Sequence, residues 1–323
     1  MKILGISFGT KNGNNDTMCR VGLEACKNAG AEIEFIHAFD WDLRPCTGCV
    51  ACSRGLTMGK GMVCSVKDDF KAFYEKMIEA DGILIVDPIF ENGASGYFHN
   101  VLDRMGPGHD TGLMKMADEK LKAEGREGLN PRYFKQKPIS FVGIGGSDWA
   151  LRVQTDHAML AMTPGWKIID NDFFSWSKDV IMQDDKIARM QEIGKNLAEA
   201  AKYIMDQDMD VIGSDDIKLW KGKEGTCPHC QCNNFHVDPE TGVVTCELCG
   251  LEGELKTVDG KLRFVFDPAN EYKAHDIMSG KGLHGDDVLH NEMRLMGLAK
   301  DEEFKKRKAY YTEICAPTPA PEK

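Results

Sequence analysis

The sequence predicts an α/β fold with a doubly wound parallel sheet, and two observations carry this prediction. Short apolar runs that do not alternate, such as Ile83–Val86, are typical of strands buried on both faces of a parallel sheet. Amphipathic stretches separate these runs over residues 1–207, so strands and helices alternate. Because parallel neighbours need crossover connections, which are right-handed, the alternation predicts three layers with the sheet in the middle.

Five predicted strands and their helices follow in order. The strands cover residues 2–8, 32–39, 83–86, 138–144 and 166–174. The helices cover residues 16–28, 66–80, 113–124, 151–162 and 184–207. In the second of these helices, apolar residues from Val66 to Met77 recur at helical spacing and share one face. Residues 105–136, rich in Gly, Lys and Glu, are predicted to be a surface insertion, with a lid beside the ligand site as the alternative.

Three glycine-bearing polar loops follow predicted strands, at residues 9–17, 91–96 and 145–149. Open α/β sheets bind ligands at the carboxyl ends of their strands, so we expect these loops to converge on one site. The first loop joins a strand to a helix N-terminus, whose amides favour an anion. It matches neither the GxGxxG pattern nor a Walker loop. The loop therefore predicts a site for one terminal monophosphate.

The composition is that of a soluble globular protein, with 42% hydrophobic and 28% charged residues among 323. A formal net charge of −11 argues against non-specific binding to nucleic acid or to an anionic membrane. No apolar run is long enough for a membrane span, and the first residues resemble a strand rather than a signal peptide, so we expect a cytoplasmic protein. Nine of the twelve cysteines form two tight groups, which favours metal or redox chemistry.

Three stretches carry information beyond the fold class. They are ISFGTKNGNNDT from Ile6, RPCTGCVAC from Arg44, and ILIVDPIFENGASGYFHNVLDR from Ile83. Together they resemble the NADPH-dependent FMN reductase and iron–sulfur flavoprotein family, over about residues 1–207. The resemblance implies a flavodoxin-like domain with strand order 2-1-3-4-5, bound FMN, and NADH or NADPH as co-substrate.

The resemblance also implies the FMN site residue by residue. The phosphate would be held by Ser7, Gly9, Thr10, Asn12, Asn15 and Thr17. The isoalloxazine edge would follow Pro88, Ile89, Phe90, Glu91, Asn92 and Gly93. The other side of the ring would be closed by Gly145, Gly146, Ser147 and Asp148. The chain departs from the family at Gly9-Thr10-Lys11, where Ser-Pro-Arg is frequent, at Phe90, often Tyr, and at His99, often Lys.

The first cysteine group has the ligand count of a [4Fe–4S] cluster. Its members are Cys46, Cys49, Cys52 and Cys64. In the iron–sulfur flavoproteins the last gap is short, whereas eleven residues separate Cys52 from Cys64 here. Many family members keep some of these cysteines and bind no cluster. The two interpretations, a cluster and partly buried thiols, both stay open.

The second cysteine group predicts a zinc ribbon over residues 208–267. Two CxxC knuckles, Cys227/Cys230 and Cys246/Cys249, are fifteen residues apart, and turns at residues 238–242 and 259–260 indicate hairpins. Rubredoxin-type iron uses the same four thiolates, so spacing does not choose between structural zinc and a redox iron. Four cysteines complete such a site, so we expect His229 and Cys232 to stand outside it.

Residues 268–323 are predicted to be a helical extension. Helices are expected at residues 286–297 and 300–312, followed by a mobile proline-spaced tail. Apolar residues from Val288 to Met296 are expected to dock on the flavin domain or on a neighbouring subunit. The irregular spacing of His275, His284 and His290 favours surface or packing roles over metal binding.

These features together predict an FMN-dependent NAD(P)H oxidoreductase that reduces an organic acceptor of the quinone, nitro, azo or activated-alkene type. The alternative is an iron–sulfur flavoprotein that carries electrons between redox proteins. A third possibility is a flavin sensor whose ribbon recruits a partner protein. No side chain is predicted to be catalytic, because the cofactor performs the hydride transfer. The resemblance implies a homo-oligomer, either a dimer or a tetramer.

Overall fold

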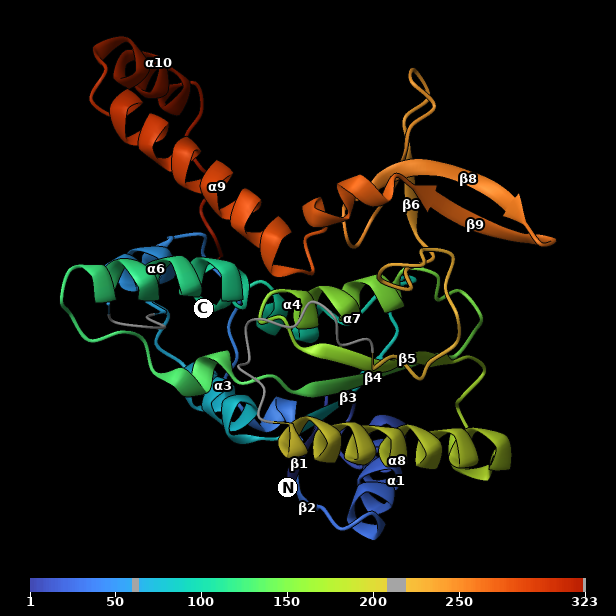
Figure 1. Ribbon diagram of the computed structural model, residues 1–323. Helices are drawn as coiled ribbons and strands as arrows, with labels where there is room; N and C mark the ends of the chain where they lie inside the picture. The colour runs from blue at the N-terminus through green and yellow to red at the C-terminus, as the bar shows by residue number, and fades with distance from the viewer. Residues whose placement is uncertain (60–63, 208–218, 322–323) are drawn as a thin grey trace. The chain divides into compact units, whose positions relative to one another are not determined.

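The computed structural model describes residues 1–59, 64–207 and 219–321. Two compact units make up the chain, Met1–Lys281 and Gly282–Lys323. The predicted boundary at residue 208 lies outside the described residues, so the three predicted domains stay a prediction. Figure 1 shows the first unit with one parallel and one antiparallel sheet.

The parallel sheet confirms the predicted flavodoxin-like order. Its strands are β1 (Lys2–Ser7), β2 (Glu32–His37), β3 (Gly82–Pro88), β4 (Pro138–Ile144) and β5 (Lys167–Phe174). All neighbours pair in parallel in the order β2-β1-β3-β4-β5. The run Ile83–Val86 in the central strand is fully buried, as expected for a strand covered on both faces.

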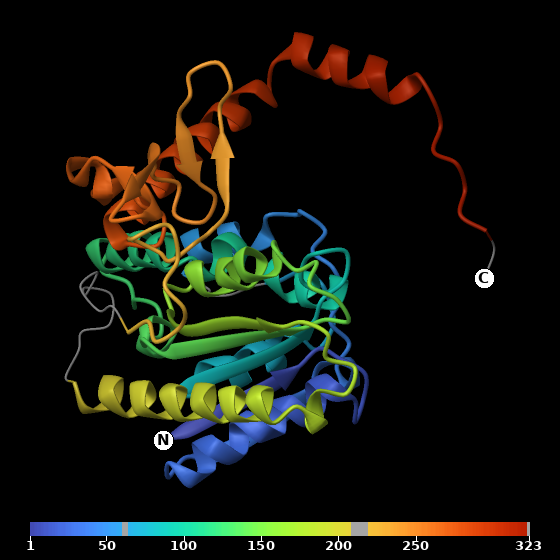
Figure 2. The same ribbon diagram turned by 90° about the vertical axis from the view of Figure 1, so that its right-hand side faces the viewer.

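Helices cover both faces of this sheet (Figure 2). One face packs against α1 (Asn14–Asn28) and α8 (Asp184–Asp206), through a buried cluster that includes Met18 and Ile193. The other face packs against α3 (Phe70–Glu79), α4 (Gly96–Leu102) and α7 (Val153–Met162), through a cluster that includes Phe73 and Leu160.

Helix α3 begins four residues later than the sequence predicts, at Phe70 instead of Val66. The acidic residues before it hold the preceding loop instead of extending the helix. Asp69 accepts a hydrogen bond from the Asp42 amide (2.9 Å), and Asp68 accepts one from the Arg44 amide (2.9 Å). Short polar side chains that bond to nearby backbone groups compete with helix formation in this way.

Residues 105–136 form helical structure that packs on the first cysteine segment. The segment itself contains the short helix α2 (Ala51–Thr57), and the insertion contains α5 (Gly106–His109), α6 (Thr111–Ala123) and the 3-10 turn η2 (Pro131–Phe134). Leu56 of α2 is buried in one cluster with Met114 and Leu121 of α6. The insertion therefore has a small core of its own with α2.

A buried lysine that the sequence reasoning missed joins α3 to β4. The Lys137 ammonium group donates to the carbonyl oxygens of Met77 (2.6 Å), Ile78 (2.9 Å) and Ala80 (2.7 Å) at the end of α3. A helix C-terminus leaves such carbonyls without partners and favours a cation. Burial nevertheless lowers the pKa of Lys137 to about 7.

The second sheet is antiparallel and confirms both predicted hairpins. Its strands, in sheet order, are β6 (Phe235–Val237), β7 (Val244–Cys246), β8 (Glu252–Val258) and β9 (Lys261–Phe266). The β8–β9 turn has positive φ at both central residues, Asp259 (49°) and Gly260 (72°), which is the tight turn that suits the twist of paired strands.

Two helices lie near the C-terminus, α9 (Met278–Leu298) and α10 (Glu302–Glu313). Helix α9 begins eight residues before the predicted start, in a glycine-rich stretch of low helix propensity. Its first turns are held by the Lys281 ammonium group, which pairs with Asp110 (2.9 Å). Of the side chains described between residues 286 and 321, none is buried. No helix among the described residues is long and apolar enough to cross a membrane.

Candidate functional site

The loops that follow the parallel strands share one edge of the sheet, because all five strands run in the same direction. The loops after β1 and β5 are joined directly. The side-chain amide of Asn14 donates to the carbonyl oxygens of Ser177 and Lys178, both at 2.9 Å. The loops after β4 and β5 are also joined, because the Ser177 amide donates to the Gly145 carbonyl (3.0 Å). The edge is therefore one connected platform.

The loop between β1 and α1 presents free hydrogen-bond donors. The first amides of a helix have no intrahelical acceptor, and here they belong to Asn14, Asn15 and Asp16. The buried Nδ2 of Asn15 has no hydrogen-bond partner among the described residues. Gly9 must lack a side chain, since a Cβ would lie 2.5 Å from that of Asn15. This orphaned donor and the open helix N-terminus fit a phosphate.

Asp16, which the sequence reasoning did not select, shapes the same loop from inside. Its carboxylate accepts from the Asn12 amide (2.7 Å) and hydrogen-bonds to His37 Nδ1 (3.1 Å). Burial favours the neutral acid, but hydrogen bonds from Ser7, Asn12 and His37 outweigh it and keep the pKa of Asp16 below its ordinary value. Ser7 is thus occupied by Asp16.

The remaining phosphate-side candidates differ in their roles. Asn12 has a φ of 57°, in the left-handed region, which turns the loop back toward the helix. The Thr17 hydroxyl donates to the Gly13 carbonyl (3.0 Å), so it closes the first helical turn. Thr10 is exposed, and its carbonyl accepts from the Gly13 amide (2.8 Å). These three residues set the shape of the loop.

The loop after β3 is a tight turn with its tip exposed. Phe90 and Gly93 exchange backbone hydrogen bonds (3.1 and 3.0 Å). Between them, Glu91 (φ 45°) and Asn92 (φ 71°) are both left-handed. This is the geometry of a two-residue hairpin turn. Five of the six predicted edge residues, Ile89 to Gly93, lie in or directly before this turn.

A buried carboxylate anchors the base of that turn. Asp87 at the end of β3 accepts from the Ser95 hydroxyl (2.6 Å) and the Ser95 amide (2.8 Å), and His157 Nε2 of α7 lies 3.4 Å away. Ser95 in turn caps α4 by accepting from the Phe98 amide (3.2 Å). Asp87 directly follows the apolar run Ile83–Val86, and no role for it was predicted from the sequence.

Helix α7 and the residue before it hold the turn at residues 90–93 through hydrogen bonds. Asp156 accepts from the Ala94 amide (2.9 Å), and the Arg152 amide donates to the Asn92 carbonyl (3.1 Å). Arg152 Nε donates to Asp156 (3.1 Å), so the two side chains hold each other. A Cβ on Gly93 would lie 2.5 Å from the Asp156 carboxylate. The turn and helix α7 are therefore closely packed at Gly93.

The loop after β4 packs beneath the same turn. The Ile89 amide donates to the Ile144 carbonyl (3.0 Å), and the Gly145 amide donates to the Phe174 carbonyl (3.0 Å). Gly145 is buried, with the Ile89 side chain 3.2 Å from where a Cβ would stand. Gly146 and Asp148 are exposed and Ser147 is partly exposed. The predicted third loop thus supplies a buried support and an exposed tip.

Large aromatic side chains stand uncovered after four of the five strands. Phe39 follows β2, Phe90 follows β3, Trp149 follows β4 and Trp176 follows β5, and all are more than half exposed. Trp176 also has a φ of 54°, which is unfavourable for a bulky residue. Strain and exposed aromatic surface at a ligand edge are features that functional sites retain.

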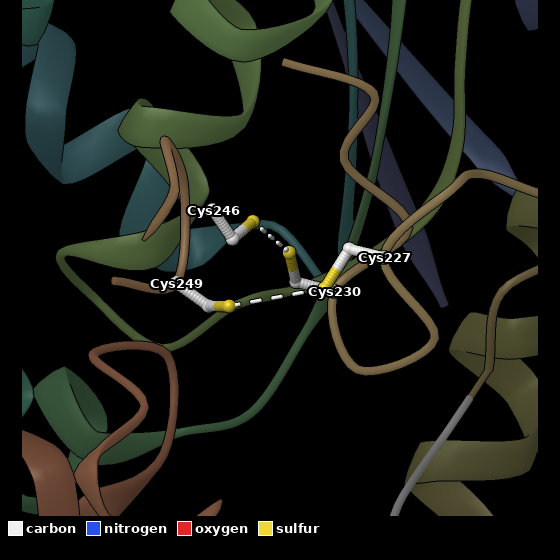
Figure 3. A group of neighbouring side chains, drawn as sticks. All are labelled: Cys227, Cys230, Cys246 and Cys249. Carbon is white, nitrogen blue, oxygen red and sulfur yellow. Dashed lines mark hydrogen bonds between the residues drawn. The ribbon is translucent and has the colours of Figure 1, made fainter. Parts of the chain in front are cut away.

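The second cysteine group forms a compact four-thiol cluster (Figure 3). The sulfur atoms of Cys227, Cys230, Cys246 and Cys249 all lie within 4.8 Å of one another. The shortest approaches join Cys230 to Cys246 (3.5 Å) and Cys227 to Cys249 (3.9 Å). Four converging thiols from two knuckles fit one tetrahedral ion.

Neither His229 nor Cys232, which lie near the four thiols, belongs to this cluster. His229 hydrogen-bonds through its two ring nitrogens to Glu271 and Asp276, both at 2.8 Å. Burial disfavours the imidazolium, but the two carboxylates outweigh burial and raise the pKa of His229 to about 9. Cys232 Sγ accepts from the Asn234 amide (3.3 Å) and lies 3.7 Å from the Thr155 hydroxyl of α7.

The first cysteine group is more open. Cys46 and Cys49 are exposed, and Cys52 and Cys64 are partly exposed. Hydrogen bonds from Ser65, the Ala51 amide and Thr47 lower the pKa of Cys49 to about 7. The buried Arg104, paired with Asp68, donates to Cys64 Sγ (3.1 Å).

Among the described residues, only the four-thiol cluster has three or more ligand atoms close enough for a single ion. An iron–sulfur cluster holds its cysteines farther apart than one ion does. The [4Fe–4S] site at the first group therefore stays a prediction.

The sheet order and the three glycine-bearing loops at its carboxyl edge define a protein of the flavodoxin-like fold. The profile of a family described as NADPH-dependent FMN reductase matches residues 1–180. The chain belongs to this family, and it is a flavin-dependent oxidoreductase that uses FMN.

Individual relatives extend this result. An iron-sulfur flavoprotein of Archaeoglobus fulgidus is 30% identical over 212 residues, which are 64% of this chain and 94% of the relative. A flavone synthase of Aspergillus candidus is 24% identical over 298 residues, 88% of this chain and 86% of the relative. A solved structure described as a flavone reductase is 39% identical, covers 100% of both chains and superposes with a TM-score of 0.85.

Proposed function

We propose that the protein is an FMN-dependent NAD(P)H oxidoreductase that reduces the activated carbon–carbon double bond of a planar aromatic enone of the flavone type. The observation that carries this proposal is the 39% identity to a flavone reductase over the whole of both chains. The likeness to a flavone synthase over 88% of this chain supports the same choice, since flavone formation is the reverse reaction. Among the four predicted acceptor types, the activated alkene is thus preferred.

The residues at the sheet edge fit FMN. Asn15 Nδ2 and the open amides of α1 would hold the phosphate, with the loop shaped by Gly9, Thr10, Asn12 and Thr17. The left-handed turn at Glu91 and Asn92 would follow the isoalloxazine edge.

The bound flavin would supply hydride transfer between the nicotinamide and the acceptor. The protein's own part is to fix these groups in place and to exclude water. Pro88 and Ile89 would support the ring edge from the end of β3, and the loop Gly145–Asp148 would close the opposite side.

The exposed aromatic side chains suit a flat acceptor. Phe90, Trp149 and Trp176 come from three neighbouring strand ends and offer apolar area that water would otherwise cover. A flat enone of the flavone type could bury both of its faces between such side chains and the flavin. Quinones and azo compounds are flat as well, so the acceptor assay must include them.

We propose structural zinc for the four-thiol cluster, with rubredoxin-type iron as the alternative. The cysteines supply about half of the buried residues of this small module, and domains of this size need such a link. An iron at this position would favour the second candidate function, electron transfer between redox proteins. We also expect a homo-oligomer, since Leu289, Met293 and Met296 form an exposed apolar stripe on α9.

The test uses the full-length protein purified without oxygen and supplied with FMN. Consumption of NADH or NADPH is followed with a flavone, a quinone, a nitroarene and an azo dye, and the flavone product is identified by mass spectrometry. We expect a gain of two hydrogens at the flavone double bond, at a rate above that with the other three acceptors. Nicotinamide oxidation without flavone reduction would overturn the acceptor, and failure to bind FMN would overturn the whole proposal.

A further inference from the structure

We propose that the module around the four thiols (residues 226–277) positions the turn after β3 (residues 89–95, the flavin-edge turn) through helix α7. Metal binding to the module would then determine how well ordered this turn is. Arg152 and Asp156 are positioning residues for the flavin-edge turn. The effect on FMN binding rests on the proposed FMN site, whereas the coupling between the module and the turn does not require bound FMN. Helix α7 has three faces, which contact the module, the turn and the parallel sheet.

The first face of α7 contacts the module. Thr155 Oγ1 lies 3.7 Å from Cys232 Sγ, and Cys232 follows the knuckle cysteine Cys230 by two residues. Ala158 is buried in the same apolar cluster as Cys227 and Leu248, and Met162 packs at its border. Residues 155, 158 and 162 recur at intervals of three and four, so they form one stripe along the helix.

The second face of α7 holds the flavin-edge turn. Asp156 is the residue directly after Thr155, and it accepts the hydrogen bond of the Ala94 amide (2.9 Å). Arg152, one turn earlier, donates its amide to the Asn92 carbonyl and its Nε to Asp156. Because Gly93 leaves no free space beside Asp156, a small displacement of α7 must be passed on to the turn.

The third face anchors α7 to the parallel sheet and limits how it can move. Val153, His157, Leu160 and Ala161 are buried there, and His157 reaches Asp87 below the turn. Contacts with the sheet on one face and with the module on the other hold α7 in one position. If the module loosens, α7 loses its contacts with the module but keeps its contacts with the sheet.

Metal loss is expected to loosen the module because three of its four ligands, Cys227, Cys246 and Cys249, are buried in its small core. Cysteines are four of the ten buried residues in this cluster, beside residues such as Val244, Leu248 and Phe264. Without an ion, the two knuckles are joined by the short pairing of β6 with β7 and by weak thiol contacts, and folding of such modules is coupled to metal binding.

The test is hydrogen–deuterium exchange on the full-length protein without FMN, before and after chelation, with metal content measured in parallel. We expect amides in residues 89–98 to exchange about tenfold faster after metal loss. Residues 9–17 serve as the internal control. The hydrogen bonds described above for this loop are made with Asp16 inside the loop and with the loop after β5, not with α7. Their exchange should therefore not change. Unchanged exchange at 89–98 after proven metal loss would overturn the inference, as would an equal rise at 9–17.

A pair of variants isolates the link. Asp156→Asn weakens the clamp, so residues 89–98 should already exchange faster with metal bound, and chelation should add less than threefold. Asp172→Asn is the matched control, since Asp172 of β5 pairs with Arg189 of α8 (3.0 Å), away from the turn. It should keep the full tenfold response. Equal responses in the two variants would refute the role of Asp156.

FMN affinity, measured on the same samples by flavin fluorescence, separates the two proposals. A loss of FMN affinity on chelation, absent in Asp156→Asn, supports both. A coupled turn in a protein that never binds FMN would sink the proposed function and leave the mechanical link intact. Tight FMN binding with an uncoupled turn would do the reverse.

Discussion

Substitution of Gly93 by alanine tests the flavin-edge turn most directly. The added methyl group would lie 2.5 Å from the Asp156 carboxylate and 3.4 Å from Arg152 Nε. The carboxylate cannot retreat without giving up its hydrogen bond from the Ala94 amide (2.9 Å). One lost hydrogen bond to a charged group costs about 1.5–3 kcal/mol. At 1.4 kcal/mol per tenfold, the Kd for FMN should rise roughly 10- to 150-fold.

The control for this substitution is Gly96→Ala, three residues away. Nothing lies within 4 Å of the position its Cβ would take, and Gly96 is the first residue of α4. Alanine favours helix, so the free energy of unfolding should be unchanged or slightly higher. FMN affinity is read from quenching of flavin fluorescence and stability from urea unfolding. The reasoning is wrong if Gly93→Ala binds FMN within twofold of wild type, or if Gly96→Ala is weakened equally.

Three further predictions address other parts of the molecule. Cys227→Ser should abolish stoichiometric metal binding in elemental analysis and lower Tm by several degrees, and full metal retention would exclude the four-thiol site. Lys137→Met leaves three buried carbonyls without a donor and should cost about 3 kcal/mol in urea unfolding. Lys135→Met, at a half-exposed ion pair, should cost under about 1 kcal/mol. If the first cysteine group holds a cluster, anaerobic protein should contain four iron and four sulfide, and Cys64→Ser should lose both.

Local patterns were enough to predict the sheet and both hairpins. The apolar run Ile83–Val86 is short, does not alternate and is followed by Pro88, which favours a buried strand. The two CxxC knuckles predicted the four-thiol cluster because their spacing is short and their chemistry is restrictive. In both cases the signal lies within a few residues of the feature that it predicts.

The clamp on the flavin-edge turn could not be predicted from sequence in the same way. Asp156 and Ala94 are 62 residues apart, and they meet only because β3 and β4 are neighbours. Lys137 and its three carbonyls are separated by nearly as much sequence. Asp16 looked like an ordinary acidic residue in a first helical turn, and only its burial beside His37 shows its role. The strand order implied by the resemblance says which elements are neighbours, but it does not say which of their side chains meet.

In the proposed FMN site, the loop between β1 and α1 would hold the phosphate with dipoles rather than with fixed charges. Lys11 is the one cationic side chain between Ser7 and Asn14, and its Nζ is paired with Asp40 (2.8 Å). Dissolved salt screens charge–charge attraction over a Debye length but leaves short amide hydrogen bonds nearly intact. Concentrated salt should therefore be a poor way to strip the cofactor, and flavin should stay with the protein through ion-exchange chromatography.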